Sequence, residues 1–199
     1  MIDEAVDAIE RGQAVIVPTD TVYGLAASAF DADAALGLYR LKSRPSTQPM
    51  AVLASSVDTL LELVPELGRR AGAIARALLP GPFTLVLPNP ARRFAWLTGE
   101  HTDTIGVRVA ELPEPMLELV GRVRALAATS ANLRGGPDPA KVDDVPQELR
   151  DAVGATIDVG ELPGVASTVI DFTAEEPRVI REGAASGAEA IERARRAAS

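Results

Sequence analysis

Residues 14–25 read Ala14-Val15-Ile16-Val17-Pro18-Thr19-Asp20-Thr21-Val22-Tyr23-Gly24-Leu25. The first four form an apolar, mostly β-branched run, which predicts a buried strand that ends at Pro18. Two hydroxyls and a carboxylate follow directly, at Thr19, Asp20 and Thr21. Hydroxyl groups suit a carboxylate and the acid suits an ammonium, so this strand exit is a candidate site for a small zwitterion. The alternative is a turn, closed by these same side chains, that only reverses the chain.

Sequence patterns typical of helices and of strands alternate along the chain on both sides of this predicted strand. Hydrophobic periodicity and capping residues predict helices at 3–11, 31–41, 56–64, 66–79, 114–124, 142–153 and 188–197. Apolar β-branched runs predict strands at 14–17, 49–54, 83–87, 104–109, 125–129, 156–159, 167–172 and 178–181. The alternation predicts one α/β domain over residues 1–199, with a mixed β-sheet flanked by helices. Ligands of such sheets bind beyond the carboxyl ends of strands, so chemistry is expected at the strand exits.

The composition excludes several kinds of active site. The 199 residues contain no cysteine and one histidine, His101, and the formal net charge is −8. No thiolate nucleophile, cysteine-ligated metal or multi-histidine metal site can be built from them. The negative charge and the few aromatic residues (Trp 1, Tyr 2, Phe 4) disfavour an RNA-binding surface. An enzyme of this composition would position its substrates and stabilise charge, without a side-chain nucleophile and an imidazole base.

The hydrophobic segments indicate a cytoplasmic protein with no membrane partner. The start of the chain is acidic and lacks the basic and apolar regions of a secretory signal. The longest nearly apolar stretch, 77–88, is interrupted by prolines and a glycine and is shorter than the roughly 20 residues of a spanning helix.

Two segments combine groups that bind phosphate. Lys42 is one of only two lysines in an arginine-rich chain, and it lies two residues before Arg44 at a predicted helix end. The two cations can converge on a triphosphate, although both would also be favourable beside a helix C-terminus for structural reasons alone. Ser130 and Asn132 follow an apolar strand and precede a glycine loop, which offers hydroxyl, amide and backbone donors to phosphate oxygens. An ordinary polar loop is the alternative there.

Two arginines occur in unusually apolar surroundings. Arg108 and Arg181 each lie in, or at the end of, a predicted apolar strand. An arginine in such a place must be ion-paired or must line a water-filled cavity, because burying an unpaired charge is costly. The sequence leaves both possibilities open.

Taken together and in this order, these segments resemble the YrdC-like family of threonylcarbamoyl-AMP synthases. The resemblance extends over residues 12–184 and rests on six collinear matches, at 18–25, 42–45, 80–84, 106–108, 128–132 and 167–169. It implies a twisted α/β fold with a large basic cavity, in the short, single-domain form of the family. It also implies a nucleotidyltransferase that makes threonylcarbamoyl-AMP and pyrophosphate from L-threonine, bicarbonate and ATP.

The resemblance further implies the roles of ten residues. A catalytic tetrad that also binds ATP falls on Lys42, Arg44, Ser130 and Asn132. Further ATP contacts are implied for Gln48, Thr104 and Arg181, and contacts to L-threonine for Thr21, Arg108 and Ser167. Gln48 departs from the lysine or asparagine that family members commonly carry at this position.

The resemblance also implies the partners. Mg²⁺ would arrive with ATP, with no metal ligands from the protein and no tightly bound cofactor. The product would pass to separate tRNA threonylcarbamoyl-transfer proteins, with direct tRNA binding absent or weak. Two alternatives remain: a diverged paralogue that binds nucleotide but uses another carbamoyl acceptor, and a non-catalytic RNA-binding module.

Overall fold

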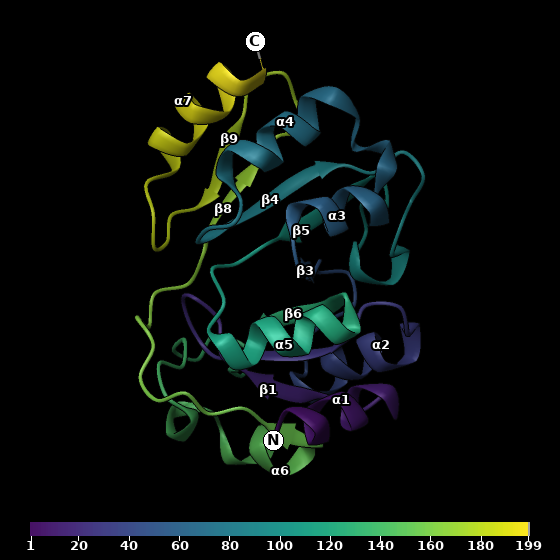
Figure 1. The fold of residues 1–199 in the computed structure, drawn as a ribbon, viewed down its shortest axis with the longest axis vertical. Helices are drawn as coiled ribbons and strands as arrows, with labels where there is room; N and C mark the ends of the chain where they lie inside the picture. The colour runs from purple at the N-terminus through teal and green to yellow at the C-terminus, as the bar shows by residue number, and fades with distance from the viewer. Residues whose placement is uncertain (199) are drawn as a thin grey trace.

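The computed structural model describes residues 1–198, and one mixed sheet runs through the whole of this part of the chain (Figure 1). The sheet has the strand order β7-β1-β2-β6-β3-β5-β4-β8-β9. Its strands are β1 Val15–Val17, β2 Gly24–Ser28, β3 Ala51–Ala54, β4 Phe83–Pro88, β5 Thr104–Arg108, β6 Ala125–Ser130, β7 Ala155–Thr156, β8 Thr168–Asp171 and β9 Arg178–Arg181. The α-helices are α1 Ile2–Glu10, α2 Ala32–Leu41, α3 Val57–Leu63, α4 Gly68–Leu78, α5 Glu114–Val123, α6 Gln147–Ala152 and α7 Gly187–Ala198. Three short 3-10 helices complete the described part, at Pro65–Leu67, Ala95–Leu97 and Val142–Asp144.

One face of the sheet is covered by helices. Alternate strand residues such as Ile16, Val52 and Val107 point into a continuous core, to which α2, α3, α4, α6 and α7 contribute apolar side chains. All three of these strand residues are completely buried. The removal of these apolar side chains from water provides the main stabilisation of the fold.

The opposite face is covered only in part. There α1 and α5 pack against residues such as Val15, Ala26 and Leu126, and together they form a second, smaller core. Figure 1 shows α5 and α1 over the half of the sheet that holds β1 and β6, whereas α4 and α7 lie at the end that holds β8 and β9. The centre of this face is left without a covering helix, and it is there that the cavity described below lies.

The two predicted helix caps are confirmed. Asp31 accepts hydrogen bonds from the backbone N–H groups of Asp33 and Ala34, at 2.9 and 3.0 Å, and so begins α2. Ser56 accepts one from the N–H of Thr59 at 3.0 Å and begins α3. Each bond satisfies an N–H group that the first turn of a helix leaves unpaired.

Three predictions of secondary structure are wrong in detail. β2 was not predicted, because its sequence is made of small residues with low strand propensity; pairing with β1 and β6 forms it nonetheless. The helix predicted over 142–153 is a 3-10 turn followed by α6, since Pro146 interrupts it. The strand predicted at 156–159 is confined to Ala155–Thr156, where it pairs with β1.

Candidate active site

A cavity of about 280 Å³ lies on the partly uncovered face of the sheet. Its floor is made of small residues from the central strands, namely Gly24, Ala51, Gly106 and Ala128. Ala51 is the register partner of both Ala128 and Gly106, so these three lie in one row across β6, β3 and β5. Because the row carries no side chain longer than a methyl group, the sheet itself leaves room for a ligand.

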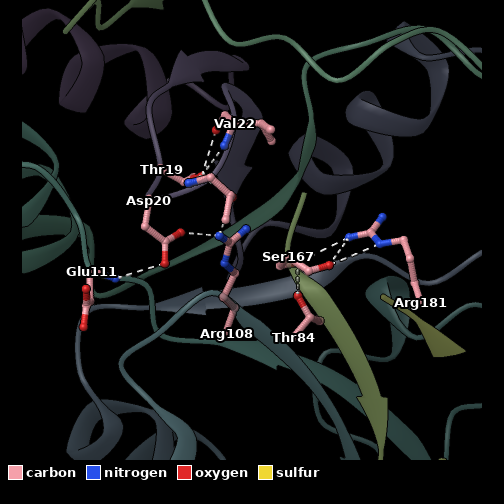
Figure 2. A network of polar contacts seen from close by, with 9 residues as sticks. Thr19, Asp20, Val22, Thr84, Arg108, Glu111, Ser167 and Arg181 are labelled. Carbon is pink, nitrogen blue, oxygen red and sulfur yellow. Dashed lines mark hydrogen bonds and ion pairs between the residues drawn. The ribbon is translucent and has the colours of Figure 1, made fainter. Parts of the chain in front are cut away.

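One end of the cavity holds a buried ion pair between Arg108 and Asp20 (Figure 2). Their side chains are only 12% and 9% exposed. The same Nη2 of Arg108 donates to the hydroxyl of Thr21 at 2.7 Å, and the second oxygen of Asp20 accepts from the N–H of Glu111 at 3.4 Å. Burial lowers the pKa of the Arg108 guanidinium, and the charge of Asp20 offsets part of that effect. The pair holds Arg108 at the end of β5, pointing at the strand exit after β1.

Arg108 keeps an unused donor in this arrangement. Its Nε is buried and has no hydrogen-bond partner, which is costly for a charged group. The neighbouring hydroxyls are already ordered, since Thr19 donates to the carbonyl of Val22 at 2.8 Å and lies 3.0 Å from the hydroxyl of Thr21. An anionic ligand at this end would therefore meet a guanidinium that Asp20 and Thr21 already hold in place.

A second arginine enters the cavity from the edge of the sheet. Arg181 at the end of β9 donates from Nη2 and Nε to the carbonyl of Ser167, at 2.8 and 3.2 Å. The hydroxyl of Ser167 lies 2.9 Å from that of Thr84 and 3.3 Å from Nη2 of Arg181 (Figure 2). The charge of Arg181 contributes to the lowered pKa of Arg108, so the two like charges act on each other.

A third arginine, Arg44, follows α2 and is held by three acceptors. Its Nε donates to Oε1 of Gln48 at 3.0 Å, Nη1 to the hydroxyl of Thr129 at 3.2 Å, and Nη2 to the carbonyl of Pro49 at 2.6 Å. Burial lowers the pKa of this guanidinium as well. Arg44 lines the cavity, whereas Gln48 lies behind it and orients it.

Lys42, Ser130 and Asn132 form a connected cluster beside Arg44. The ammonium of Lys42 donates to the carbonyl of Ser130 and, at 2.9 Å, to Oδ1 of Asn132. The hydroxyl of Ser130 donates to the same Oδ1 at 2.7 Å. The amide nitrogen of Asn132 donates to the carbonyl of Gly136 at 2.8 Å and to Asp138 at 3.4 Å, which fixes the orientation of the amide.

The ammonium of Lys42 is poorly solvated in this cluster. Lys42 is 4% exposed, and burial together with the charge of Arg44 lowers its pKa from 10.5 to about 8, against a smaller raising effect of Asp138. Two of its three N–H groups are used by these two acceptors.

If Lys42 contacts ATP, as the resemblance implies, the affinity of the free protein for ATP should fall as the pH rises through about 8, because Lys42 then loses its proton and its charge. The decrease should approach roughly tenfold per pH unit well above that value. Titration calorimetry with a non-hydrolysable ATP analogue measures it. Lys141→Ala, which alters the exposed lysine paired with Glu161, should keep the decrease, and Lys42→Arg should flatten it. A flat wild-type profile would contradict the role of Lys42.

The structure brings the ten predicted site residues to one region, but in two layers. Six line the cavity: Arg44, Thr104, Arg108, Ser130, Ser167 and Arg181. The other four, Thr21, Lys42, Gln48 and Asn132, stand behind these and hydrogen-bond to them. Thr104 donates to the carbonyl of His101 at 3.1 Å.

The sequence did not indicate a structural role for several residues that hold the cavity-lining side chains in place. Asp20 was considered as a ligand for an ammonium, and the structure pairs it with Arg108. Thr84, Thr129 and Asp138 lie in or beside the matched segments but carry no predicted role. Thr129 and Asp138 are near Ser130 and Asn132 in the sequence, whereas only the pairing of β4 with β8 brings Thr84 beside Ser167.

No group of three or more His, Asp or Glu side chains within residues 1–198 is arranged to hold a metal ion. The cations and hydroxyls of the cavity are suited to anions and do not suit a divalent metal. Within the same residues, no helix is long and apolar enough to span a membrane.

A sheet whose open face carries three arginines and several hydroxyls around a cavity belongs to the class of folds suited to small anionic ligands. A family model described as "Telomere recombination" (Sua5_yciO_yrdC) matches residues 7–183. A relative from Mycobacterium tuberculosis is 37% identical over 186 residues, which cover 93% of this chain and 85% of the relative. The chain therefore belongs to the Sua5/YciO/YrdC family.

Solved structures agree with this assignment. The structure of Pyrococcus abyssi Sua5 complexed with L-threonine is 34% identical, with a TM-score of 0.83 over 97% of this chain and 56% of that one. Escherichia coli YciO is 26% identical, with a TM-score of 0.81 over 93% of this chain and 90% of that one. The P. abyssi relative, 37% identical over 88% of this chain and 52% of its own length, is named a threonylcarbamoyl-AMP synthase.

Proposed function

We propose that this chain is an L-threonylcarbamoyladenylate synthase, which forms threonylcarbamoyl-AMP and pyrophosphate from L-threonine, bicarbonate and ATP. The observation that carries the proposal is the convergence of Arg44, Arg108 and Arg181 on one cavity, in a chain whose relatives bear that name. As a nucleotidyltransferase of this kind, it would supply an intermediate for threonylcarbamoyladenosine modification of tRNA. Separate transfer proteins would consume that intermediate.

The reaction depends on charge neutralisation more than on a nucleophilic side chain. The amine of threonine combines with bicarbonate to give a carbamate and water, and a carbamate oxygen then attacks the α-phosphorus of ATP. Pyrophosphate leaves with the electron pair of the broken phosphorus–oxygen bond. Both partners in this step are anions, so the barrier includes their repulsion as well as the loss of freedom on bringing them together.

We assign the threonine end to Arg108, Thr21 and Ser167. Arg108 lines the cavity, and its guanidinium is the natural partner for the carboxylate of threonine. Thr21 keeps that guanidinium oriented, and Ser167 offers a hydroxyl from the position directly before β8.

We assign the nucleotide end to the remaining seven residues. Arg44 and Lys42 would neutralise the triphosphate, and Ser130 and Asn132 would orient the α-phosphate. Thr104 and Arg181 would complete the ATP contacts, while Gln48 would act by holding Arg44. Mg²⁺ would be part of the substrate, bound to the phosphates of ATP.

The test is detection of threonylcarbamoyl-AMP by mass spectrometry after incubation of the purified protein with Mg–ATP, L-threonine and bicarbonate. We expect the product, with pyrophosphate release that requires threonine. Equal ATP turnover without threonine would instead indicate a diverged paralogue with another carbamoyl acceptor. RNA binding with steep salt dependence and no turnover would indicate a binding module.

A further inference from the structure

Gly106 occupies the middle of β5, where a glycine weakens the strand. It pairs with Ala51 of β3 on one side and with Val86 of β4 on the other. Glycine within a strand usually marks a bulge, a backbone conformation closed to other residues, or a place where backbone or ligand approaches closely.

Three of these explanations do not apply to Gly106: a bulge, a backbone conformation closed to other residues, and the close approach of another backbone. The register of β5 is continuous with both neighbours, and Gly106 is not among the glycines with positive φ. A Cβ added there would meet nothing nearer than 3.7 Å, the distance to the Cα of Ala51 and the carbonyl oxygen of Met50. The fold would therefore accept alanine at this position, and the approach of a ligand remains as the reason for glycine.

The place of Gly106 within the cavity indicates which part of the ligand approaches it. Residues two apart in a strand point to the same face, about 6.6–6.8 Å from each other. Thr104, Gly106 and Arg108 thus follow one another along the cavity, and all three line it. Under the proposed function, Thr104 belongs to the ATP end and Arg108 to the threonine end, so Gly106 lies between the two substrates.

We propose that the reacting atoms meet over Gly106, and that the hydrogen in place of a side chain is a steric requirement of the transfer step. This inference rests on the proposed function. The bond from the carbamate oxygen to the α-phosphorus forms there, while the bond from that phosphorus to the oxygen leading to the β-phosphate breaks. A methyl group on the floor at this point would separate the two substrates without occupying the binding place of either one.

The experiment compares Gly106→Ala and Gly106→Val with wild type. We expect threonylcarbamoyl-AMP formation to fall about tenfold or more in the alanine variant and at least about a hundredfold in the valine variant. Threonine alone and a non-hydrolysable ATP analogue alone should each bind the alanine variant within about threefold of wild type. In the alanine variant, each ligand should bind at least about tenfold more weakly when the other ligand is present than when it is absent.

The midpoint of thermal unfolding of the alanine variant should be unchanged or raised, since the strand gains a side chain. Gly121→Ala, which adds a methyl group to a site with nothing within 4 Å, is the matched control.

Each other outcome overturns the inference. Normal turnover by Gly106→Ala would show that no ligand needs this space, and a markedly lower unfolding midpoint would show that the glycine serves the fold. Loss of one substrate alone, with the other unaffected, would place that substrate over Gly106. Absence of product from the wild-type protein would refute the proposed function itself. That outcome is distinct from a failure of the inference about Gly106, which is measured on the variants.

Discussion

Arg44→Ala is expected to lower kcat/KM for ATP by about two to three orders of magnitude, since removing one donor that stabilises developing charge costs roughly 2.7–4 kcal/mol in other enzymes. Arg44 is prearranged for that role, because Gln48, Thr129 and Pro49 hold its guanidinium at three points. No reorganisation of the arginine is needed when the phosphates arrive. Steady-state pyrophosphate release measures the effect.

Arg40→Ala provides the matched control for this prediction. Arg40 lies in the same helix region, is exposed, and makes a single long hydrogen bond of 3.5 Å to the carbonyl of Asp33. Its removal should leave turnover within about twofold of wild type, as expected for a surface residue. Arg44→Lys should recover only part of the activity, because an ammonium keeps the charge but not the planar fork. Near-normal pyrophosphate release by Arg44→Ala would remove Arg44 from the site.

The fold was predictable wherever side-chain pattern and local capping agree. The run ending at Pro18 is a buried strand, and Asp31 and Ser56 begin helices, as their local patterns indicate. β2 could not be predicted, because Gly24–Ser28 carries little intrinsic strand preference. Its neighbours β1 and β6 hold it in the sheet, and these come from positions before it and about 100 residues after it.

The sequence predicted residues that lie together in the structure, but it could not predict how they are arranged. The sequence required Arg108 to be paired or to line a cavity, and in the structure it does both. Spacing alone could not reveal that Lys42 lies behind Ser130 while Arg44 faces the cavity, since this depends on how α2 ends against β6. The partner of Arg108 was equally hidden, because Asp20 lies 88 positions earlier in the chain.

Arg108→Met should have two large effects at once. Loss of the only positive group assigned to the threonine carboxylate should lower kcat/KM for threonine by about 10³-fold, while binding of an ATP analogue stays close to wild type. The same change leaves Asp20 buried without its counter-charge, which should lower the free energy of unfolding by about 3–5 kcal/mol. Denaturant unfolding, followed together with threonine-dependent pyrophosphate release, measures both effects.

The double variant Arg108→Met, Asp20→Asn separates stability from catalysis. The amide removes the uncompensated charge and can still accept from the N–H of Glu111, so most of the lost stability should return. Threonine-dependent activity should not return, because the guanidinium assigned to the carboxylate of threonine is still missing. If activity recovers together with stability, Arg108 serves the fold and threonine binds elsewhere. If neither single nor double variant loses activity, the threonine end of the cavity is wrongly assigned.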